Sequence, residues 1–508
     1  MEYHLTKKSI DQLSTALNTV VEQPVDIDLT LPDYCPDIER ILSCELIPKI
    51  YMTNLGSDRL NVEGGSCVRI LYIDGERGCM RSYEYTQPFS ESIPIGDHPD
   101  NCAAVVEAKP EYLNCRALSP RKLSLHGAVS LHSKVYVADG LDYYSYSDGG
   151  DLQVKSESIN ASDLCGLCTE SFSVQEEIPV GANIVIGVLL SHRLYAKITE
   201  LKAIHNKIML NAELKLELMY LSDIENKQVD CMSYSLPVSR VIDCDGADDN
   251  SVIDGRLDVM SDELRLGGDA LDGSALLSLE AKLSFSALCY SEKEIDIISD
   301  AFSTERDAQP EYAPFSCVCG TIFRSYTDIG KSTADVDDTI SKVIDVHCEK
   351  LTVDPTSADG RIILNTKLCV GMLYENTDGE TKYIEREAEF IYTPDTDGRD
   401  HAEAVCAGLD SLSYRMADGH RVELRAEICY RLTLCRRMSC SAVTRITADD
   451  DAPSRSPEGS LILYYTDGGE NVWDISKRFS SRPEDIISEN GLDGDSIDNG
   501  VMLLIPTT

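Results

Sequence analysis

Apolar and polar residues alternate with a period of two along most of this chain. The pattern is clearest over residues 210–220, LNAELKLELMY, where apolar residues hold every second position. Successive side chains of a β-strand point to opposite faces of its sheet, so this period indicates strands with one buried face and one exposed face. A helix would instead need apolar residues three and four positions apart. The pattern predicts a mainly β protein.

Six segments share this pattern and together define a repeat. They are VEGGSCVRILY (62–72), LHGAVSLHSKVY (125–136), LNAELKLELMY (210–220), LEAKLSFSALCY (279–290), LNTKLCVGMLY (364–374) and LRAEICYRLTLC (424–435). Copies whose last residue lies ten and eleven positions after the first, with eleven and twelve residues, alternate along the chain, which indicates that the repeating unit contains two of these strands. An extra residue of this kind is also how a β-bulge would look in sequence. Equivalent points of successive units lie 145–154 residues apart.

The repeat divides the chain into three tandem units, at residues 1–158, 159–308 and 309–446. Polar turns such as IDGERGCMR (73–81) separate the alternating segments of a unit, which is typical of antiparallel hairpins. Each unit is therefore expected to be an antiparallel sandwich or a barrel-like module, and the pattern does not distinguish the two. Residues 9–23 have helical spacing, so the first unit is expected to begin with a helix.

The end of the chain follows a different pattern. Residues 447–459 combine charged residues with Pro, Ser and Gly and have no apolar period, which predicts a linker. Residues 460–508 then predict a small module with the order strand, helix, helix, strand. Its elements are expected at LILYY (461–465), NVWDISKRF (471–479), RPEDIISEN (482–490) and VMLLIP (501–506).

This C-terminal module resembles a LysM domain. The resemblance rests on residues that fall in the spacing of that family: Tyr464, Gly469, Glu470, Trp473, Asp474, Ile475, Ile486, Asn490, Leu492, Gly500, Leu503, Leu504, Ile505 and Pro506. LysM domains commonly bind N-acetylglucosamine polymers in a shallow groove between two loops. By position, the resemblance implies a groove for a ligand or partner made of Gly469, Glu470, Asn471, Val472, Asn490, Gly491, Leu492 and Asp493.

Two further features of the module bear on this groove. It contains nine acidic residues against three basic ones, which counts against binding to a sugar polymer. Trp473 is the only tryptophan of the chain, and in this context it is expected to belong to the small core rather than to a sugar-stacking surface.

The upstream units resemble the SPOCS domain. Residues 31–44, LPDYCPDIERILSC, are similar to its signature PD-x-x-PDI-x-[RK]-IL, and the PF-S-x-x-IP pattern at residues 88–94 agrees with it, with a partial match at 172–179. SPOCS domains occur in endospore-forming bacteria, notably in proteins that build the spore envelope. Tandem SPOCS units followed by one LysM domain resemble the SipL family.

The resemblance implies a function without catalysis. A protein of this kind would be a scaffold or adaptor in the assembly of the endospore coat and cortex, in the cytoplasm of the mother cell at the forespore surface. Its LysM-like end would bind the spore morphogenetic ATPase SpoIVA, which forms the basement layer of the coat. The alternative is a cell-wall protein that binds peptidoglycan, through its N-acetylglucosamine polymers, in the LysM groove.

Composition narrows the range of partners. The chain has 46 Lys and Arg against 87 Asp and Glu, a net charge of −41, so it is expected to bind neither nucleic acid nor anionic lipid. The longest apolar stretch, residues 182–190, is about half of the ~20 residues that a membrane span requires. The N-terminal residues lack the apolar core of a secretory signal. A cytoplasmic protein without membrane insertion is expected.

The sequence shows no pattern that points to a metal, a cofactor or catalysis. The 19 cysteines are odd in number and scattered, which favours reduced thiols over a disulfide framework. Cys165 and Cys168 have the spacing of half a zinc site, but no second pair accompanies them. The acidic loop at 243–254 lacks the glycine and glutamate positions of a calcium loop. A hydrolase would need a nucleophile paired with a base, and none is evident, so no enzyme is expected.

Overall fold

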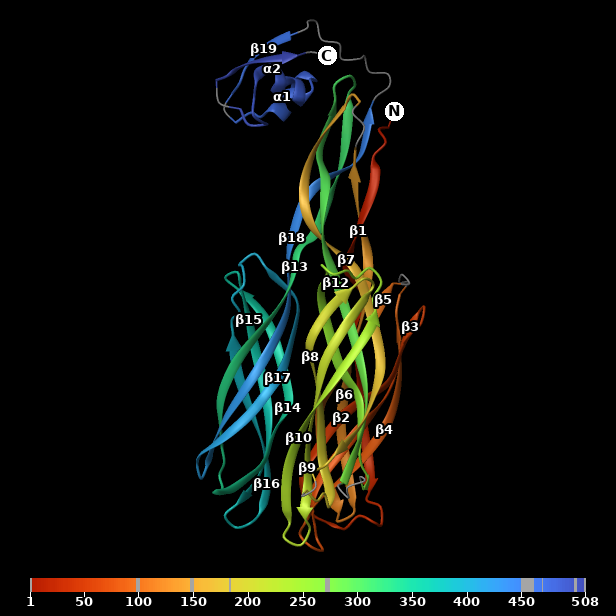
Figure 1. Ribbon diagram of the computed structural model, residues 1–508, viewed down its shortest axis with the longest axis vertical. Helices are drawn as coiled ribbons and strands as arrows, with labels where there is room; N and C mark the ends of the chain where they lie inside the picture. Colours follow the sequence, from red (N-terminus) through yellow and green to blue (C-terminus); the bar gives the residue numbers. More distant parts are fainter. Residues whose placement is uncertain are drawn as a thin grey trace.

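The molecule is elongated and has three parts along its length. The computed structural model describes residues 2–96, 101–146, 150–181, 184–269, 275–448, 461–467, 469–497 and 500–506. Figure 1 shows a body of three β lobes, a narrow stalk of long strands, and a small module beside the far end of the stalk. The strands dominate this structure, so the prediction of a mainly β fold is confirmed.

Each lobe is one unit of six strands, and the three units repeat the same order. Unit 1 consists of β1 (Thr6–Thr30), β2 (Ile38–Leu55), β3 (Arg59–Asp74), β4 (Met80–Pro94), β5 (Cys102–Ser119) and β6 (Lys122–Ser145). Unit 2 consists of β7 (Leu152–Pro179), β8 (Val188–Ile204), β9 (Lys207–Asp223), β10 (Gln228–Asp243), β11 (Val252–Asp269) and β12 (Ala275–Ser303). Unit 3 consists of β13 (Ala308–Asp335), β14 (Ile340–Ala358), β15 (Arg361–Asn376), β16 (Thr381–Tyr392), β17 (His401–Asp418) and β18 (Arg421–Ala448).

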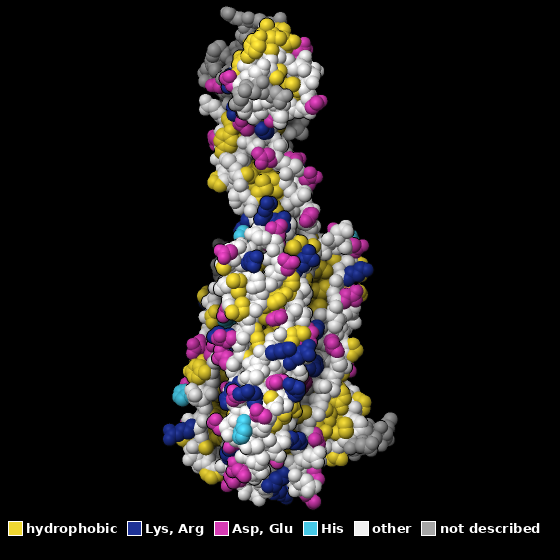
Figure 2. Space-filling view, turned by 90° about the vertical axis from the view of Figure 1, so that its left-hand side faces the viewer, with side chains coloured by type: hydrophobic (Ala, Val, Ile, Leu, Met, Phe, Trp, Pro, Cys, Tyr) yellow, Lys and Arg dark blue, Asp and Glu magenta, His cyan; other side chains and the backbone are white. Residues whose placement is uncertain are grey.

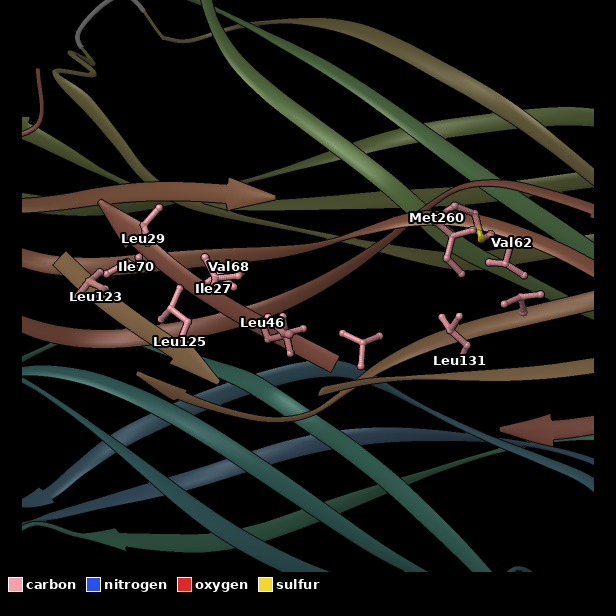
Figure 3. Packing of buried hydrophobic residues seen from close by; sticks show 14 of the residues in the cluster. Ile27, Leu29, Leu46, Val62, Val68, Ile70, Leu123, Leu125, Leu131 and Met260 are labelled. Carbon is pink, nitrogen blue, oxygen red and sulfur yellow. The ribbon is translucent and has the colours of Figure 1, made fainter. Parts of the chain in front are cut away.

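The two sheets of each unit pack face to face, so each unit is a β-sandwich. The second, third and fourth strands form one sheet, and the first, sixth and fifth strands form the other. In unit 1 both sheets contribute to one core, which includes Ile27, Leu29, Leu46, Val62, Val68, Ile70, Leu123, Leu125 and Leu131. Figure 3 shows these side chains meeting between the strands. Two separate sheets with a shared core settle the choice between sandwich and barrel.

The six repeated segments occupy the six central strands of these sheets. The strands β3, β6, β9, β12, β15 and β18 each lie in the middle of three. The pairing of every copy with one of its neighbouring strands shifts by one residue at or beside the last residue of the copy. The unpaired extra residue of this bulge lies on the neighbouring strand and not in the copy. The predicted bulges are therefore present, although the copies themselves do not carry them.

The N-terminal helix predicted over residues 9–23 is wrong. These residues lie in β1, which pairs with β6 from Thr6 to Thr30. A bulge between Thr15 and Leu17 switches the buried face from even to odd positions, and this switch gives the apolar residues a spacing that resembles a helix. An isolated helix of this length is marginal in water, whereas pairing with β6 satisfies the backbone along the whole strand.

The first and last strands of every unit continue past the sandwich and build the stalk. The pairs β1–β6, β7–β12 and β13–β18 stay in antiparallel register along nearly their full lengths. Their far halves surround a core that all three units supply: Ile10, Tyr143, Ile159, Ala161, Ile295, Ile297, Phe315, Cys317 and Ala442. No unit can complete this core alone. Pairing of Ala161 with Cys319 also joins sheets of units 2 and 3.

In the body the three units surround a common axis. The strand β4 contacts β8, β10 contacts β14, and β16 contacts β2, so the contacts follow one cyclic order. Bulges at equivalent positions of β2, β8 and β14 place one apolar residue from each unit near the axis. These residues pack in one cluster with the neighbouring central strands: Leu42, Leu190, Ile344, Leu71, Met219 and Leu373. The repeat therefore behaves as a trimer within one chain.

The unit boundaries expected from the sequence do not all coincide with the ends of strands. The boundary between residues 158 and 159 lies inside β7, and that between 308 and 309 lies at the start of β13. Residues 447 and 448, at the start of the expected linker, close β18. The rest of the expected linker, residues 449–459, lies outside the described residues.

The C-terminal module has the predicted order of strand, helix, helix and strand. It consists of β19 (Leu461–Tyr465), α1 (Val472–Phe479), α2 (Pro483–Asn490) and β20 (Met502–Pro506). The two strands pair with each other as an antiparallel sheet of their own.

The module contacts the stalk through its tryptophan. The ring of Trp473 lies edge-on to that of Phe302, with 5.0 Å between the centroids, and its Nε1 donates a 2.9 Å hydrogen bond to Asp300. Lys477 forms a 2.7 Å ion pair with the same carboxylate. Trp473 is buried, but it is not one of the residues that form the core of the module. The prediction that it belongs to that core is therefore wrong, because its ring packs against the stalk.

Replacing Leu131 by alanine should destabilise unit 1. Leu131 is 0% exposed in the sandwich core, so the cavity should cost about 2–5 kcal/mol of the free energy of unfolding, measured by urea denaturation. Leu118 is 58% exposed and is the matched control, and its replacement by alanine should change stability by less than about 0.5 kcal/mol. Equal losses in the two variants would contradict the assignment of the core.

Replacing Asp300 by alanine should release the module from the stalk. Because Trp473 is the only tryptophan, its fluorescence reports on this contact alone, and the emission should shift to longer wavelength as the indole becomes hydrated. Asp296 lies exposed on the same strand, and its replacement by alanine should leave the spectrum unchanged. An unchanged spectrum of Asp300→Ala would contradict the contact between Trp473 and the stalk, because the ring would then be buried by the module itself.

Candidate functional site

The residues that the sequence predicted to line a groove lie in the C-terminal module. Its core consists of Val472, Ile475, Ile486, Leu503 and Ile505, which come from both helices and from β20. Each helix has eight residues, too few to be stable alone, so packing on the sheet of β19 and β20 holds them in place. The two predicted groove loops are therefore anchored at both of their ends.

Glu470, in the first loop, is committed to interactions within the module. Its carboxylate accepts hydrogen bonds from the backbone N–H of Asp467 and the hydroxyl of Tyr464, both at 2.9 Å, and it pairs with Arg478 at 2.9 Å. The Asp467 N–H, together with the Tyr464 hydroxyl and the Arg478 charge, holds the pKa of Glu470 below its usual range. Gly469 precedes it at a φ of +90°, which favours glycine. Glu470 orders the loop and offers little free charge to a ligand.

The remaining residues of the first loop also serve the local fold. Asn471 caps α1, because its side chain accepts a 2.8 Å hydrogen bond from the N–H of Asp474. Val472 is fully buried, and its N–H donates to the carbonyl of Asp495 at 2.9 Å. Asn471 also forms a β-bridge with Ser496. The structure thus places the first loop beside residues 495–496, a few positions beyond the predicted second half of the groove.

The second loop begins with another structural residue. The Asn490 side chain donates to the carbonyls of Ile486 (2.8 Å) and Leu504 (2.7 Å) and accepts from the N–H of Leu504 (2.7 Å). Gly491 closes α2 at a φ of +61°. Leu492 packs against the module core. The exposed members of the predicted groove are Gly469, Gly491 and Asp493, so the groove presents few side-chain groups to a ligand.

The stalk contacts the module beside the first loop, at Asp495. Lys155 on β7 lies 3.4 Å from the carboxylate of Asp495, which also accepts a 2.8 Å hydrogen bond from the N–H of Trp473. Burial acts to raise the pKa of Asp300, but hydrogen bonds from Lys477 and Trp473 outweigh it and lower that pKa. The contact between stalk and module therefore combines one aromatic pair, Trp473 with Phe302, with ion pairs and charge-assisted hydrogen bonds around it.

The outer face of the β19–β20 sheet is apolar, and its side chains stay largely exposed among the described residues. Leu461, Leu463, Tyr465 and Met502 are 49%, 61%, 66% and 49% exposed. Leu504 and Pro506 are their apolar neighbours on the paired strand. Figure 2 shows hydrophobic side chains gathered over this end of the molecule. We call Leu461, Leu463, Tyr465 and Met502 the outer face.

Sequence reasoning missed the outer face, although a signal for it was present. A strand with one buried face alternates apolar and polar residues, and LILYY has no polar position. In a two-stranded sheet covered by helices on one side, the second row of apolar side chains has to point away from the core. Such a strand predicts a surface for a partner.

The cysteine pair and the acidic loop that the sequence analysis considered lie in contacts within and between the units. Cys165 and Cys168 lie near two further cysteines: the Sγ atoms of Cys244 and Cys289 are 3.8 Å apart, and the Cys165 thiol donates to the Cys289 carbonyl at 3.3 Å. In the described part of the chain, no group of three or more His, Cys, Asp or Glu residues could hold a metal ion. Asp254, which closes the acidic loop, instead accepts a hydrogen bond from Thr433 of unit 3, and burial raises its pKa.

Two segments of the chain match a known family. Residues 37–118 and 185–263 match the family described as SipL, SPOCS domain. The first segment covers β2–β5 of unit 1, and the second covers β8–β10 and most of β11 of unit 2. Each match therefore contains all or most of the strands that lie between the first and the last strand of a unit. The equivalent strands of unit 3 lie outside both segments, although the unit repeats the same order.

Two further findings complete the comparison. No curated protein matches this chain. Of the helices in the described part of the chain, none has the length and apolar character that a membrane span requires. The two family matches support a SipL-like protein that carries SPOCS domains and is related to sporulation.

Proposed function

We propose that this protein is a non-catalytic scaffold in the assembly of the endospore envelope, its coat and cortex. It acts in the mother cell at the forespore surface, and its LysM-like C-terminal module binds the morphogenetic ATPase SpoIVA. The SPOCS matches support the process. The architecture supports the role, because three sandwiches with a shared stalk form a stiff body that presents one small module at its end.

The outer face is the observation that carries this proposal. Four large apolar side chains lie on a two-stranded sheet whose strands have only five residues each. Each side chain is about half exposed, so burial of the remainder would contribute roughly 1 kcal/mol for each, and the patch is suited to be the centre of a protein interface. On a surface as charged as this one, a contiguous apolar patch marks an interaction site.

The charge of the module supports a protein partner over a glycan. The module contains nine acidic residues and three basic ones, which favours a partner whose contact surface is basic. Among the residues of the predicted groove, the polar side chains of Glu470, Asn471 and Asn490 form hydrogen bonds within the module itself. Trp473, the aromatic ring that could stack on a sugar, lies against Phe302 of the stalk.

Replacing Leu463 and Tyr465 by serine should weaken binding of the full-length protein to SpoIVA at least about tenfold, measured by calorimetry. Both side chains point away from the module core, so the thermal stability should stay unchanged. Leu118→Ser is the matched control, because Leu118 is an exposed leucine on β5 at the other end of the molecule.

The same proteins should be tested on insoluble peptidoglycan. Binding of the wild type to peptidoglycan but not to SpoIVA would replace our proposal with that of a wall-binding protein. Replacing Glu470 and Asn471 by alanine removes the α1 cap and should cost the module about 1 kcal/mol. If this variant stays folded and loses SpoIVA binding while the Leu463 and Tyr465 variant keeps it, the contact lies in the groove.

A further inference from the structure

A groove of about 1130 Å³ lies between units 2 and 3. Its walls come from β8 and β11 of unit 2 and from β14 and β17 of unit 3, with further side chains from the strands beside them. We call it the body groove. Each of these four strands lies at the end of its sheet. An edge strand has one row of backbone N–H and C=O groups that its own sheet does not pair, so the body groove is bordered by backbone to which another strand can bind.

The equivalent side of unit 1 shows what such a groove accepts. There the edge strands are β2 and β5, and β11 of unit 2 packs on β2. Met260 of β11 belongs to the core of unit 1 and is 7% exposed, and Figure 3 shows it near Val62. Lys49 of β2 pairs with Asp262 of β11 at 3.8 Å. One extended strand therefore closes this side of unit 1 with an apolar side chain.

The repeat has an acidic residue where unit 2 would need the same methionine. Met260 is the unpaired extra residue of a bulge in β11, opposite the fourth and fifth residues of the repeated segment in β12. The equivalent bulge of β17 lies opposite the fourth and fifth residues of the segment in β18, and its extra residue is Asp410. A carboxylate is costly to bury in an apolar core, and Asp410 instead pairs with Lys197 of β8 at 2.9 Å. Because β17 does not pack closely on β8, the body groove remains between the units.

Apolar side chains that are buried in unit 1 are more exposed in unit 2. Leu46 and Ile50 of β2 are 6% and 3% exposed, in the same core as Met260. Their equivalents on β8 are Leu194 and Ile198, which face the same positions of the repeated segment. Both are only partly buried, and both line the body groove. An apolar group placed over them would remove this surface from water.

Contacts between units 2 and 3 fix the walls of the body groove. Besides the pair of Lys197 with Asp410, Arg431 of β18 donates a 3.2 Å hydrogen bond to the carbonyl of Gly255 on β11. All four residues line the groove. The space is therefore preformed, which lowers the cost of binding a ligand.

The charges along the body groove indicate which partner it suits. Among the lining residues, Asp and Glu outnumber Lys and Arg by six to four. Of the basic side chains, Lys215 pairs with Glu217 at 2.6 Å and Lys197 with Asp410, so both are already neutralised. The groove therefore suits a segment with apolar and basic residues better than an acidic one.

We propose that the body groove binds an extended segment of a partner protein. The segment adds as a strand along the free edge of β8 and places a large apolar side chain over Leu194 and Ile198, as Met260 enters the core of unit 1. Backbone hydrogen bonds to β8 provide affinity, and the apolar side chain provides specificity. This site is separate from the outer face, so one molecule can hold one partner on its body and another on its C-terminal module.

The test uses a labelled peptide derived from the stretch of β11 that fills the equivalent site of unit 1. The peptide has the sequence of residues 255–265, with Asp258, Asp262 and Glu263 replaced by threonine to match the charge of the body groove. Fluorescence anisotropy with the full-length protein should show saturable binding. A control peptide with the further change Met260→Asp should bind at least about tenfold more weakly.

Variants of the full-length protein locate the binding. Asp410→Met gives β17 the residue that β11 has, so β17 should close over the body groove. Peptide binding should then fall at least about tenfold, while the melting temperature is maintained or rises. Ile198→Asp should weaken binding to a similar extent. Ile204→Asp is its matched control, because Ile204 is 44% exposed on the same strand and does not line the groove.

Absence of saturable binding to the wild type, or equal binding by the wild type and Asp410→Met, would overturn the proposal. If Ile198→Asp does not fold, Asp410→Met decides alone. If the wild type sediments as a dimer and Asp410→Met as a monomer, the groove holds a second copy of this chain, and the proposal of a separate partner is wrong. The variant with serine at positions 463 and 465 should bind the peptide as the wild type does, so this test is independent of the outer face.

Discussion

The pairing of the first strand with the last strand of each unit is the constraint on which the rest of the structure depends. It closes one sheet of each sandwich, and because the paired strands are longer than the sandwich, their free halves have to be buried elsewhere. They are buried against one another, in a stalk core with contributions from all three units. The stalk then sets the positions of the three lobes and provides Phe302 and Asp300, on which the C-terminal module rests.

The sequence predicts those parts of the fold in which local pattern and three-dimensional environment agree. A central strand has neighbours on both sides and one buried face, so its alternation is strict, and all six repeated segments are central strands. Residues 9–23 show the opposite case. Their face switches at the bulge between Thr15 and Leu17, and their partner lies more than a hundred residues away in β6, so a local reading finds a helix. Long-range pairing overrides local propensity here.

In the C-terminal module, too, the sequence predicts some features and misses others. The resemblance to a LysM domain located the two loops, yet most of their polar groups turn out to hold the module together, as Asn471 and Asn490 do. The outer face could have been read from LILYY, since a strand without polar positions has a second apolar row to place. The packing of Trp473 on Phe302, and the pairing of Arg193 with Glu45 and Asp345, could not be read from the sequence. Each contact joins residues from distant parts of the chain, whose approach depends on the stalk and the bulges.

The most direct test of this account is hydrogen exchange of the full-length protein, resolved along the stalk. The account predicts slow exchange of the backbone amides in residues 6–14 and in their partners 137–145, with protection similar to that of the matching stretches of β7, β12, β13 and β18. One cooperative stalk would produce this pattern. Rapid exchange of residues 6–14, with the other two strand pairs still protected, would contradict it, because the three units would then lack the shared core that joins them.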